Sequence, residues 1–220
     1  MVSRNRMFGV LFISILFCCI SFAANAVEVI DGDTLESEGV IYRLEGIDAP
    51  EYGQKCNARG GSKWACGEAA SNRLRQLVEN TDVICAGIGR DDYQRVIARC
   101  KAGEIDVGQK LVLEGLDWAF VKYSDTYVEE EAEARRKSIG IWQTTTLTAW
   151  EFRAERWSKA ASVAPEGCPI KGNISKNGRI AHPPWSPWYE RTRINRAKGE
   201  RWFCSEADAL AAGWRLPRWN

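Results

Sequence analysis

A chain of 220 residues with 45% hydrophobic and 10% aromatic residues is long enough for one ordinary domain with a packed core and an appendage. The charge is uneven: residues 27–150 hold 15 Lys and Arg against 22 Asp and Glu, whereas residues 151–220 hold 13 against 7. Because residues 27–150 are net negative, their overall charge cannot attract a polyanion. Binding of a polyanion would need local arginines, a cation or the basic tail.

The first 26 residues have the features of an export signal. Arg4 and Arg6 precede an apolar run from Met7 to Phe22, and residues 24–26 provide a small-x-small cleavage site. The apolar run is shorter than the roughly 20 residues that a bilayer span needs. We therefore expect a cleaved signal, no stable membrane anchor, and a periplasmic or secreted protein.

Six cysteines remain after the signal, and an even number in an exported chain favours disulfides. Two of them lie symmetrically about a turn at Asp92-Tyr93, so they are expected to face each other across a hairpin. Two others would close a Gly-rich loop, and the last two would connect the ends of the tail. The expected pairs are Cys56 with Cys66, Cys85 with Cys100, and Cys168 with Cys204.

The elements that follow are short strands with interleaved helices. Period-two and helical patterns predict strands at 27–30 and 40–44, a hairpin of 82–88 with 95–101, and helices at 67–80, 106–115 and 128–137. The apolar stretch 116–121 is either a strand or an extended connector. This order suits an α+β fold in which helices pack on a small β-barrel.

Carboxylates gather between residues 29 and 51. Asp33 follows an Asp-Gly turn, Arg43 lies within an apolar strand, and Asp48 and Glu51 bracket an Ala-Pro step. Two hard oxygen donors, a third carboxylate and a fixed cation suit a metal-assisted reaction on a phosphate ester. The single histidine, His182, lies far from this cluster, which disfavours chemistry built on a histidine base or nucleophile.

Four segments resemble the staphylococcal-nuclease-like, or thermonuclease, family. They are IDGDTL (30–35), YRLEGIDAPE (42–51), DDYQR followed by VIA (91–98), and LVLEGLDWA with a later GIW (111–142). The segments occur in the family's order and spacing. The resemblance implies a five-stranded OB-fold β-barrel with about three helices over residues 27–142, and a sugar-nonspecific phosphodiesterase that acts on DNA and RNA, expected as a monomer.

The resemblance also implies a calcium site and a base. Asp33 and Asp48 would bind one Ca²⁺ through their carboxylates, and the backbone carbonyl of Ala49 would be a further ligand. Glu51 would position or deprotonate the attacking water.

Two arginines and a tyrosine are implied for the phosphate. Arg43 and Arg95 would clamp it and stabilise the charge of the transition state, and Tyr93 would contact it. The planar fork of arginine suits this task because it binds two oxygens at once. The alternative function is a non-catalytic protein that keeps the barrel and binds nucleic acid or an anionic envelope polysaccharide.

The remaining chain divides into an expected linker at 143–166, helical over 150–161, and a basic, aromatic-rich module at 167–220. The module resembles the sunset domain and, more loosely, the Ada-type zinc segment through CPIKGNIS, WYERT, GERWFC and AAGW. Cys168, His182 and Cys204 offer only three zinc ligands where structural zinc takes four, so we favour the disulfide over Zn²⁺. Its aromatic and basic residues suit either binding of nucleic acid or anionic polysaccharide, or a small aromatic core.

Overall fold

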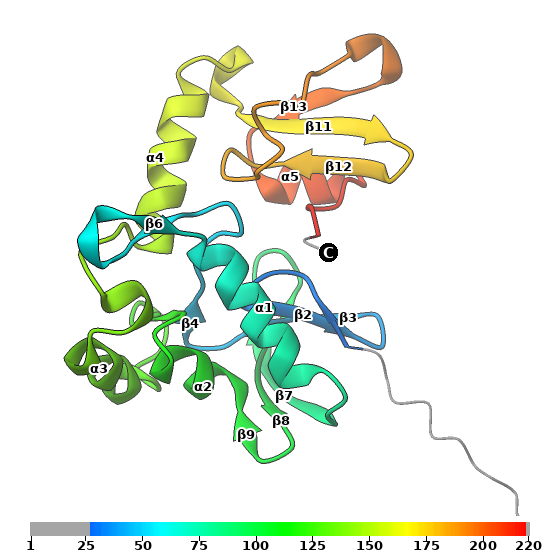
Figure 1. Ribbon diagram of the computed structural model, residues 1–220. Helices are drawn as coiled ribbons and strands as arrows, with labels where there is room; N and C mark the ends of the chain where they lie inside the picture. Colours follow the sequence, from blue (N-terminus) through cyan, green and yellow to red (C-terminus); the bar gives the residue numbers. More distant parts are fainter. Residues whose placement is uncertain (1–26, 219–220) are drawn as a thin grey trace, which may run out of the picture.

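The computed structural model describes residues 27–218 (Figure 1). The predicted export signal, residues 1–26, lies outside this range. No helix within the described range is long and apolar enough to span a membrane.

One mixed sheet forms the centre of the first part of the chain. Its strands follow the order β1-β2-β3-β8-β7, and β9 pairs with β8. Only the β3–β8 pair is parallel, with Arg43 opposite Ile97. The strands are β1 (Glu28–Val29), β2 (Thr34–Ser37), β3 (Val40–Leu44), β7 (Val83–Arg90), β8 (Val96–Ala102) and β9 (Ile105–Asp106).

Two helices and this sheet enclose the main core. Helix α1 (Cys66–Val78) buries Leu74 and Leu77 on one side, as its 3.6-residue apolar period predicts. Helix α2 (Val107–Leu113) begins at Asp106, whose side chain accepts a hydrogen bond from the backbone N–H of Gln109. The core combines these helices with Leu35, Leu44 and other buried residues of the sheet.

The predicted α+β class and the three helices before residue 143 are confirmed, but the strands of the described residues form no closed barrel. The strands β4 (Ile47–Asp48) and β10 (Trp118–Ala119) pair with each other in a separate sheet, so they do not join β1 to β7. The chain leaves β3 at Gly46, whose φ of 75° turns it out of the main sheet. The edges of β1 and β7 therefore remain apart.

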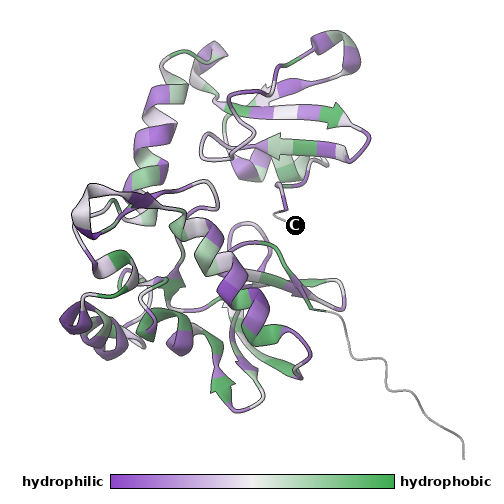
Figure 2. Ribbon diagram, viewed as in Figure 1, coloured by the Kyte–Doolittle hydropathy of each residue, from purple (hydrophilic) through white to green (hydrophobic). Residues whose placement is uncertain are grey.

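A charged helix and a second helix follow. Helix α3 (Val128–Lys137) is largely hydrophilic in Figure 2, consistent with its i,i+4 pairs Glu131–Arg135 and Glu133–Lys137. Helix α4 (Ala149–Ala161) lies within the predicted linker and begins with a capping box between Thr148 and Glu151. The stretch is thus an ordered helix that leads away from the first part of the chain (Figure 1).

The last part of the chain forms a small sheet of order β12-β11-β13 with one helix. These elements are β11 (Ile170–Ser175), β12 (Gly178–His182), β13 (Arg201–Phe203) and α5 (Glu206–Ala211). Ile170, Phe203 and Trp214 lie in its aromatic core. Its contacts with the rest of the chain include Trp157 of α4, 6.3 Å from Trp185 between ring centroids, and Arg218, which forms ion pairs with Glu28 and Glu36.

All three predicted disulfides are confirmed: Cys56–Cys66, Cys85–Cys100 and Cys168–Cys204. Cys85 and Cys100 are direct partners in the β7–β8 register, as the symmetry about the turn predicts. The zinc alternative loses both of its sulfur ligands to the third disulfide. The ring nitrogens of His182 lie 3.2 Å from Ser186 Oγ and from Asn173 Oδ1.

Replacing Cys85 and Cys100 together by Ala is expected to lower the free energy of unfolding by about 3 kcal/mol. The disulfide closes a loop with a sequence separation of 15 residues, and opening it returns conformational freedom to the unfolded chain. Urea denaturation of the oxidised protein and of the variant measures the difference. An unchanged unfolding midpoint would contradict it.

Candidate active site

Three predicted site residues converge where β2, β3 and β4 meet. Arg43 Nη1 lies 2.5 Å from Asp33 Oδ2, and Arg43 Nη2 donates to Asp48 Oδ1 at 3.0 Å. The backbone N–H of Ala49 donates to Asp33 Oδ2 at 2.9 Å. Both aspartates are buried, with exposed fractions of 7% and 1%. Two carboxylates therefore face one guanidinium in an almost water-free pocket.

Glycines at two positions allow the chain to approach itself around these carboxylates. A Cβ on Gly32 would lie 2.6 Å from the Cβ of Ala49, and a Cβ on Gly67 would lie 1.8 Å from the carbonyl oxygen of Glu51. The first close contact packs the turn of Asp31 against residue 49. The second packs the loop of Glu51 against the start of α1. Any side chain at either glycine would displace the site.

Glu51 is fixed at both its backbone and its side chain. Its N–H donates to Gln54 Oε1 at 3.2 Å, and its carbonyl accepts from the N–H of Gln54 at 2.7 Å. The carboxylate receives Arg153 Nη1 on Oε1 at 2.8 Å. Burial raises the pKa of Glu51 to about 8, against the opposing effect of Arg153.

Arg153 is a residue of this site that the sequence reasoning missed. It extends from α4, and besides Glu51 it contacts both oxygens of Asp48, Oδ1 at 3.2 Å from Nη1 and Oδ2 at 2.7 Å from Nη2. Its guanidinium thus bridges a predicted metal ligand and the predicted base. No local motif indicates this contact, because the two partners are separated by 105 residues.

Arg95 and Tyr93 lie together in the turn between β7 and β8. Asp91 organises the turn: its Oδ1 accepts the N–H groups of both residues at 3.0 Å, and its Oδ2 binds Arg95 Nε at 2.7 Å. The guanidinium of Arg95 lies 5.2 Å from the ring centroid of Tyr93. Within residues 27–218 Arg95 makes no hydrogen bond or ion pair with Asp33, Asp48 or Glu51. Against desolvation by burial, the charge of Arg43 and, more weakly, that of Arg95 lower the pKa of Asp33.

Asp117 is a second residue that the sequence reasoning missed. It precedes β10, is 0% exposed, and neither of its carboxylate oxygens has a hydrogen-bond partner within residues 27–218. Burial raises its pKa well above the usual range, and the charge of Asp33 raises it further. Burial similarly raises the pKa of Asp31 to about 7. The sequence does contain a signal for Asp117: it is a carboxylate within the apolar stretch LVLEGLDWA, and acidic residues are almost never fully buried unless they have a partner.

The charges of the site fit a divalent cation. Five carboxyl groups, those of Asp31, Asp33, Asp48, Glu51 and Asp117, lie with two guanidinium groups, Arg43 and Arg153. Burial raises the pKa of all of these carboxyl groups except Asp33, and a bound divalent cation would favour their charged forms. The orphaned oxygens of Asp117 and the convergence of Asp33 and Asp48 are features that a hard cation with oxygen ligands would satisfy. Among the described residues no three His, Cys, Asp or Glu side chains form a ready metal cluster.

Buried carboxylates and the two guanidinium groups that pair with them therefore share one pocket beside the sheet. Residues 42–144 match the family described as staphylococcal nuclease homologue. The match begins after Asp33 and ends before Arg153, so the observed site extends beyond it on both sides.

Three known proteins are similar to this chain. A protein named uncharacterized endonuclease from Haemophilus influenzae is 32% identical over 123 residues, covering 53% of this chain and 64% of that protein. The micrococcal nuclease of Shigella flexneri is 30% identical over 159 residues, 64% of this chain and 84% of that protein. The succinoglycan biosynthesis protein ExoI of Rhizobium meliloti is 30% identical over 139 residues, 61% and 72% of the two chains.

The chain belongs to the staphylococcal nuclease homologue family. It spans less than two thirds of the Haemophilus protein.

Proposed function

We propose that the protein is an exported, calcium-dependent phosphodiesterase that hydrolyses DNA and RNA. The observation that carries this proposal is the convergence of Asp33, Asp48 and Glu51 on Arg43 and Arg153 in one buried pocket. The three disulfides support an oxidising compartment outside the cytoplasm.

The proposed division of the chain follows the expected one. Residues 27–142 are the nuclease domain, 143–166 a helical connection, and 167–220 a small module. The connection takes part in the site through Arg153.

Each residue has a defined task in the proposed hydrolysis. Glu51, held by Arg153 and Gln54, accepts a proton from the attacking water. Arg43 and Arg95 bind the non-bridging phosphate oxygens, where negative charge increases as the water attacks. Asp91 orients Arg95 through its Nε, and Tyr93 lies beside that guanidinium to contact the phosphate.

Asp33, Asp48 and the carbonyl of Ala49 are the residues that would hold Ca²⁺. When bound, the ion supplies positive charge that polarises the phosphoryl group. Arg43 contacts both aspartates, so the two carboxylates lie next to each other, and a cation would share them with this guanidinium. The acidic composition of residues 27–150 supports the need for added positive charge before a phosphate binds.

Chelation is expected to abolish hydrolysis of single-stranded DNA. The purified full chain is assayed with Ca²⁺, with EGTA, and after Ca²⁺ is restored, and isothermal titration calorimetry measures binding of the ion alone. Asp33→Asn is expected to weaken calcium binding, because it removes one of the two charged ligands. Activity that is indifferent to EGTA would disprove the calcium requirement. Binding of DNA or RNA without turnover in several divalent ions would favour the non-catalytic alternative.

A further inference from the structure

A basic groove lies between α4 and the loop closed by Cys56 and Cys66. Its volume is about 370 Å³. Four cationic side chains and one carboxylate line it, so its formal charge is net positive. The charged residues are Lys55, Lys63, Arg156, Lys159 and Glu155, and the other lining residues the argument uses are Gln54, Asn57 and Phe152.

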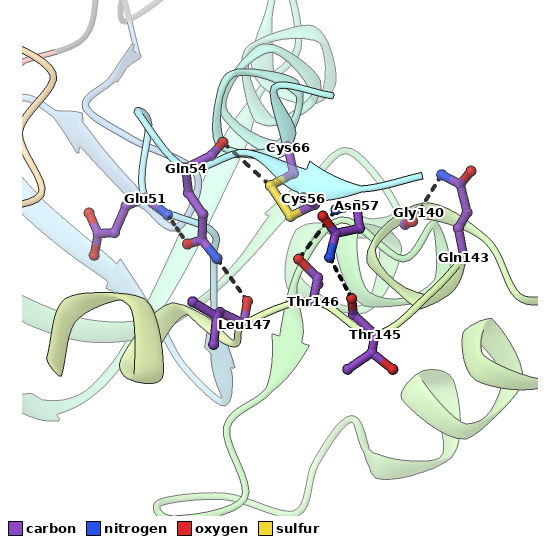
Figure 3. Close-up of a disulfide and its surroundings, with 10 residues drawn as sticks. All are labelled: Glu51, Gln54, Cys56, Asn57, Cys66, Gly140, Gln143, Thr145, Thr146 and Leu147. Atoms are coloured by element: carbon purple, nitrogen blue, oxygen red, sulfur yellow. Dashed lines mark hydrogen bonds between the residues drawn. A yellow bond between two sulfur atoms is a disulfide. The ribbon is translucent and has the colours of Figure 1, made fainter. Parts of the chain in front are cut away.

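Covalent and hydrogen bonds fix one wall of the groove and connect it to the segment before α4. The disulfide Cys56–Cys66 closes one wall, where β5 (Cys56–Asn57) pairs with β6 (Lys63–Trp64). Asn57 Nδ2 donates to the carbonyl of Thr145 at 2.8 Å, which connects this wall to the segment before α4. Figure 3 shows the disulfide, Asn57 and residues 145–147 side by side. The groove is therefore built into the fold.

The groove adjoins the active site through Gln54. This side chain is 1% exposed, accepts the N–H of Glu51, and donates to the carbonyl of Leu147 at 2.8 Å. Helix α4 also contributes to both sites. Its Arg153 contacts Glu51, and its Phe152 and Arg156 line the groove. A polymer bound in the groove would thus lie beside Gln54, which contacts the backbone of Glu51 (Figure 3).

The side chains suit a single nucleic-acid strand. Lysine and arginine neutralise backbone phosphates, and an aromatic face accepts a base by stacking. Phe152 supplies the aromatic face, with the guanidinium of Arg156 5.2 Å from its ring centroid. Residues 27–150 as a whole are net negative, with 15 basic and 22 acidic residues. The groove is net positive, so it provides a local positive charge for a nucleic-acid strand.

We propose that this groove is a subsite that holds the backbone of a single-stranded DNA or RNA substrate next to the active site. The proposal rests on the proposed nuclease function and adds a strand-binding site outside the catalytic pocket. From the position of the groove we expect it to contribute to the binding of a long substrate. It should have no effect on the hydrolysis of a phosphodiester that is too small to reach it.

Charge reversal in the groove tests the proposal in the full-length mature chain. The variant Lys63→Glu/Lys159→Glu is compared with Lys176→Glu/Lys198→Glu, which makes the same charge change at exposed positions of the C-terminal module. Fluorescence anisotropy measures Kd for a labelled single-stranded 20-mer of mixed sequence, chosen at about 20 nucleotides to extend beyond one binding site. The groove variant is expected to raise Kd about tenfold or more and to lower the salt slope by about 0.7 per lysine.

Turnover assays separate the subsite from the catalytic pocket. The groove variant is expected to raise KM for the oligonucleotide and to leave kcat/KM for bis(p-nitrophenyl) phosphate unchanged. Unchanged Kd, an equal rise in Kd for the control variant, or preferential binding of an anionic polysaccharide such as alginate would each overturn the proposal. Failure of the wild type to hydrolyse either substrate would instead refute the nuclease function, and anisotropy would still decide on the groove.

Discussion

Glu51→Gln is expected to lower kcat for single-stranded DNA by ~10²–10⁴-fold, the usual contribution of a general base. Glutamine keeps an oxygen that accepts the hydrogen bond of Arg153, so the local structure and KM should change little. It has no carboxylate that takes a proton from water. Stopped-flow or gel-based turnover with saturating Ca²⁺ measures the effect.

The matched control for Glu51→Gln is Glu129→Gln. Glu129 is exposed on α3 and lines neither the pocket nor the basic groove. This replacement changes the net charge by the same amount as Glu51→Gln. It should leave kcat within about twofold, because surface substitutions away from a functional site have small effects. If Glu51→Gln retained wild-type kcat, Glu51 could not be the base.

Arg153→Gln is expected to lower kcat by ~10²-fold, at the low end of the loss observed when one preorganised donor is removed from an active site. Arg153 holds Glu51 at 2.8 Å and Asp48 at 2.7 Å, and without it the two buried carboxylates repel each other and lose their fixed orientation. The same variant is expected to bind Ca²⁺ more tightly, because the arginine no longer competes with the ion for Asp48. Calorimetric titration with Ca²⁺ alone measures this second effect.

Arg153→Gln is expected to lower kcat and to raise the affinity for Ca²⁺. These opposite changes distinguish a positioning role of Arg153 from a merely structural one. General loss of folding would weaken both catalysis and calcium binding, whereas loss of the Arg153 contacts weakens only catalysis. Arg156→Gln, one turn further along α4, is the control and should alter neither kcat for bis(p-nitrophenyl) phosphate nor calcium affinity. Unchanged values of both quantities in Arg153→Gln would show that the ion pairs have no part in the reaction.

Local sequence signals predict the elements well, because their causes are local. The cap at Asp106 and the charge pairs of residues 128–137 predict helices whose bounds in the structure agree within a few residues. The turn between the paired cysteines of the β7–β8 hairpin predicts their disulfide for the same reason. Closure of the barrel is a property of the whole sheet, and no short pattern indicates that β4 and β10 pair apart from it.

The site is predictable only in part. Asp33, Arg43 and Asp48 lie within one short segment, so their convergence follows from two adjacent strands and a turn. Arg153 and Asp117 reach the site from distant parts of the chain. Their roles depend on how α4 and β10 pack, which neither the capping box of α4 nor the apolar stretch around Asp117 specifies.

The contact of Arg153 with Asp48 also bears on the kinetics of folding. It joins residues 105 positions apart, and the pairs of Arg218 with Glu28 and Glu36 join residues 190 and 182 positions apart. Contacts of such high sequence separation form slowly, because a long loop must close before they stabilise the chain. We therefore expect the pocket to reach its final arrangement late in folding, after the hairpins and helices have formed around it.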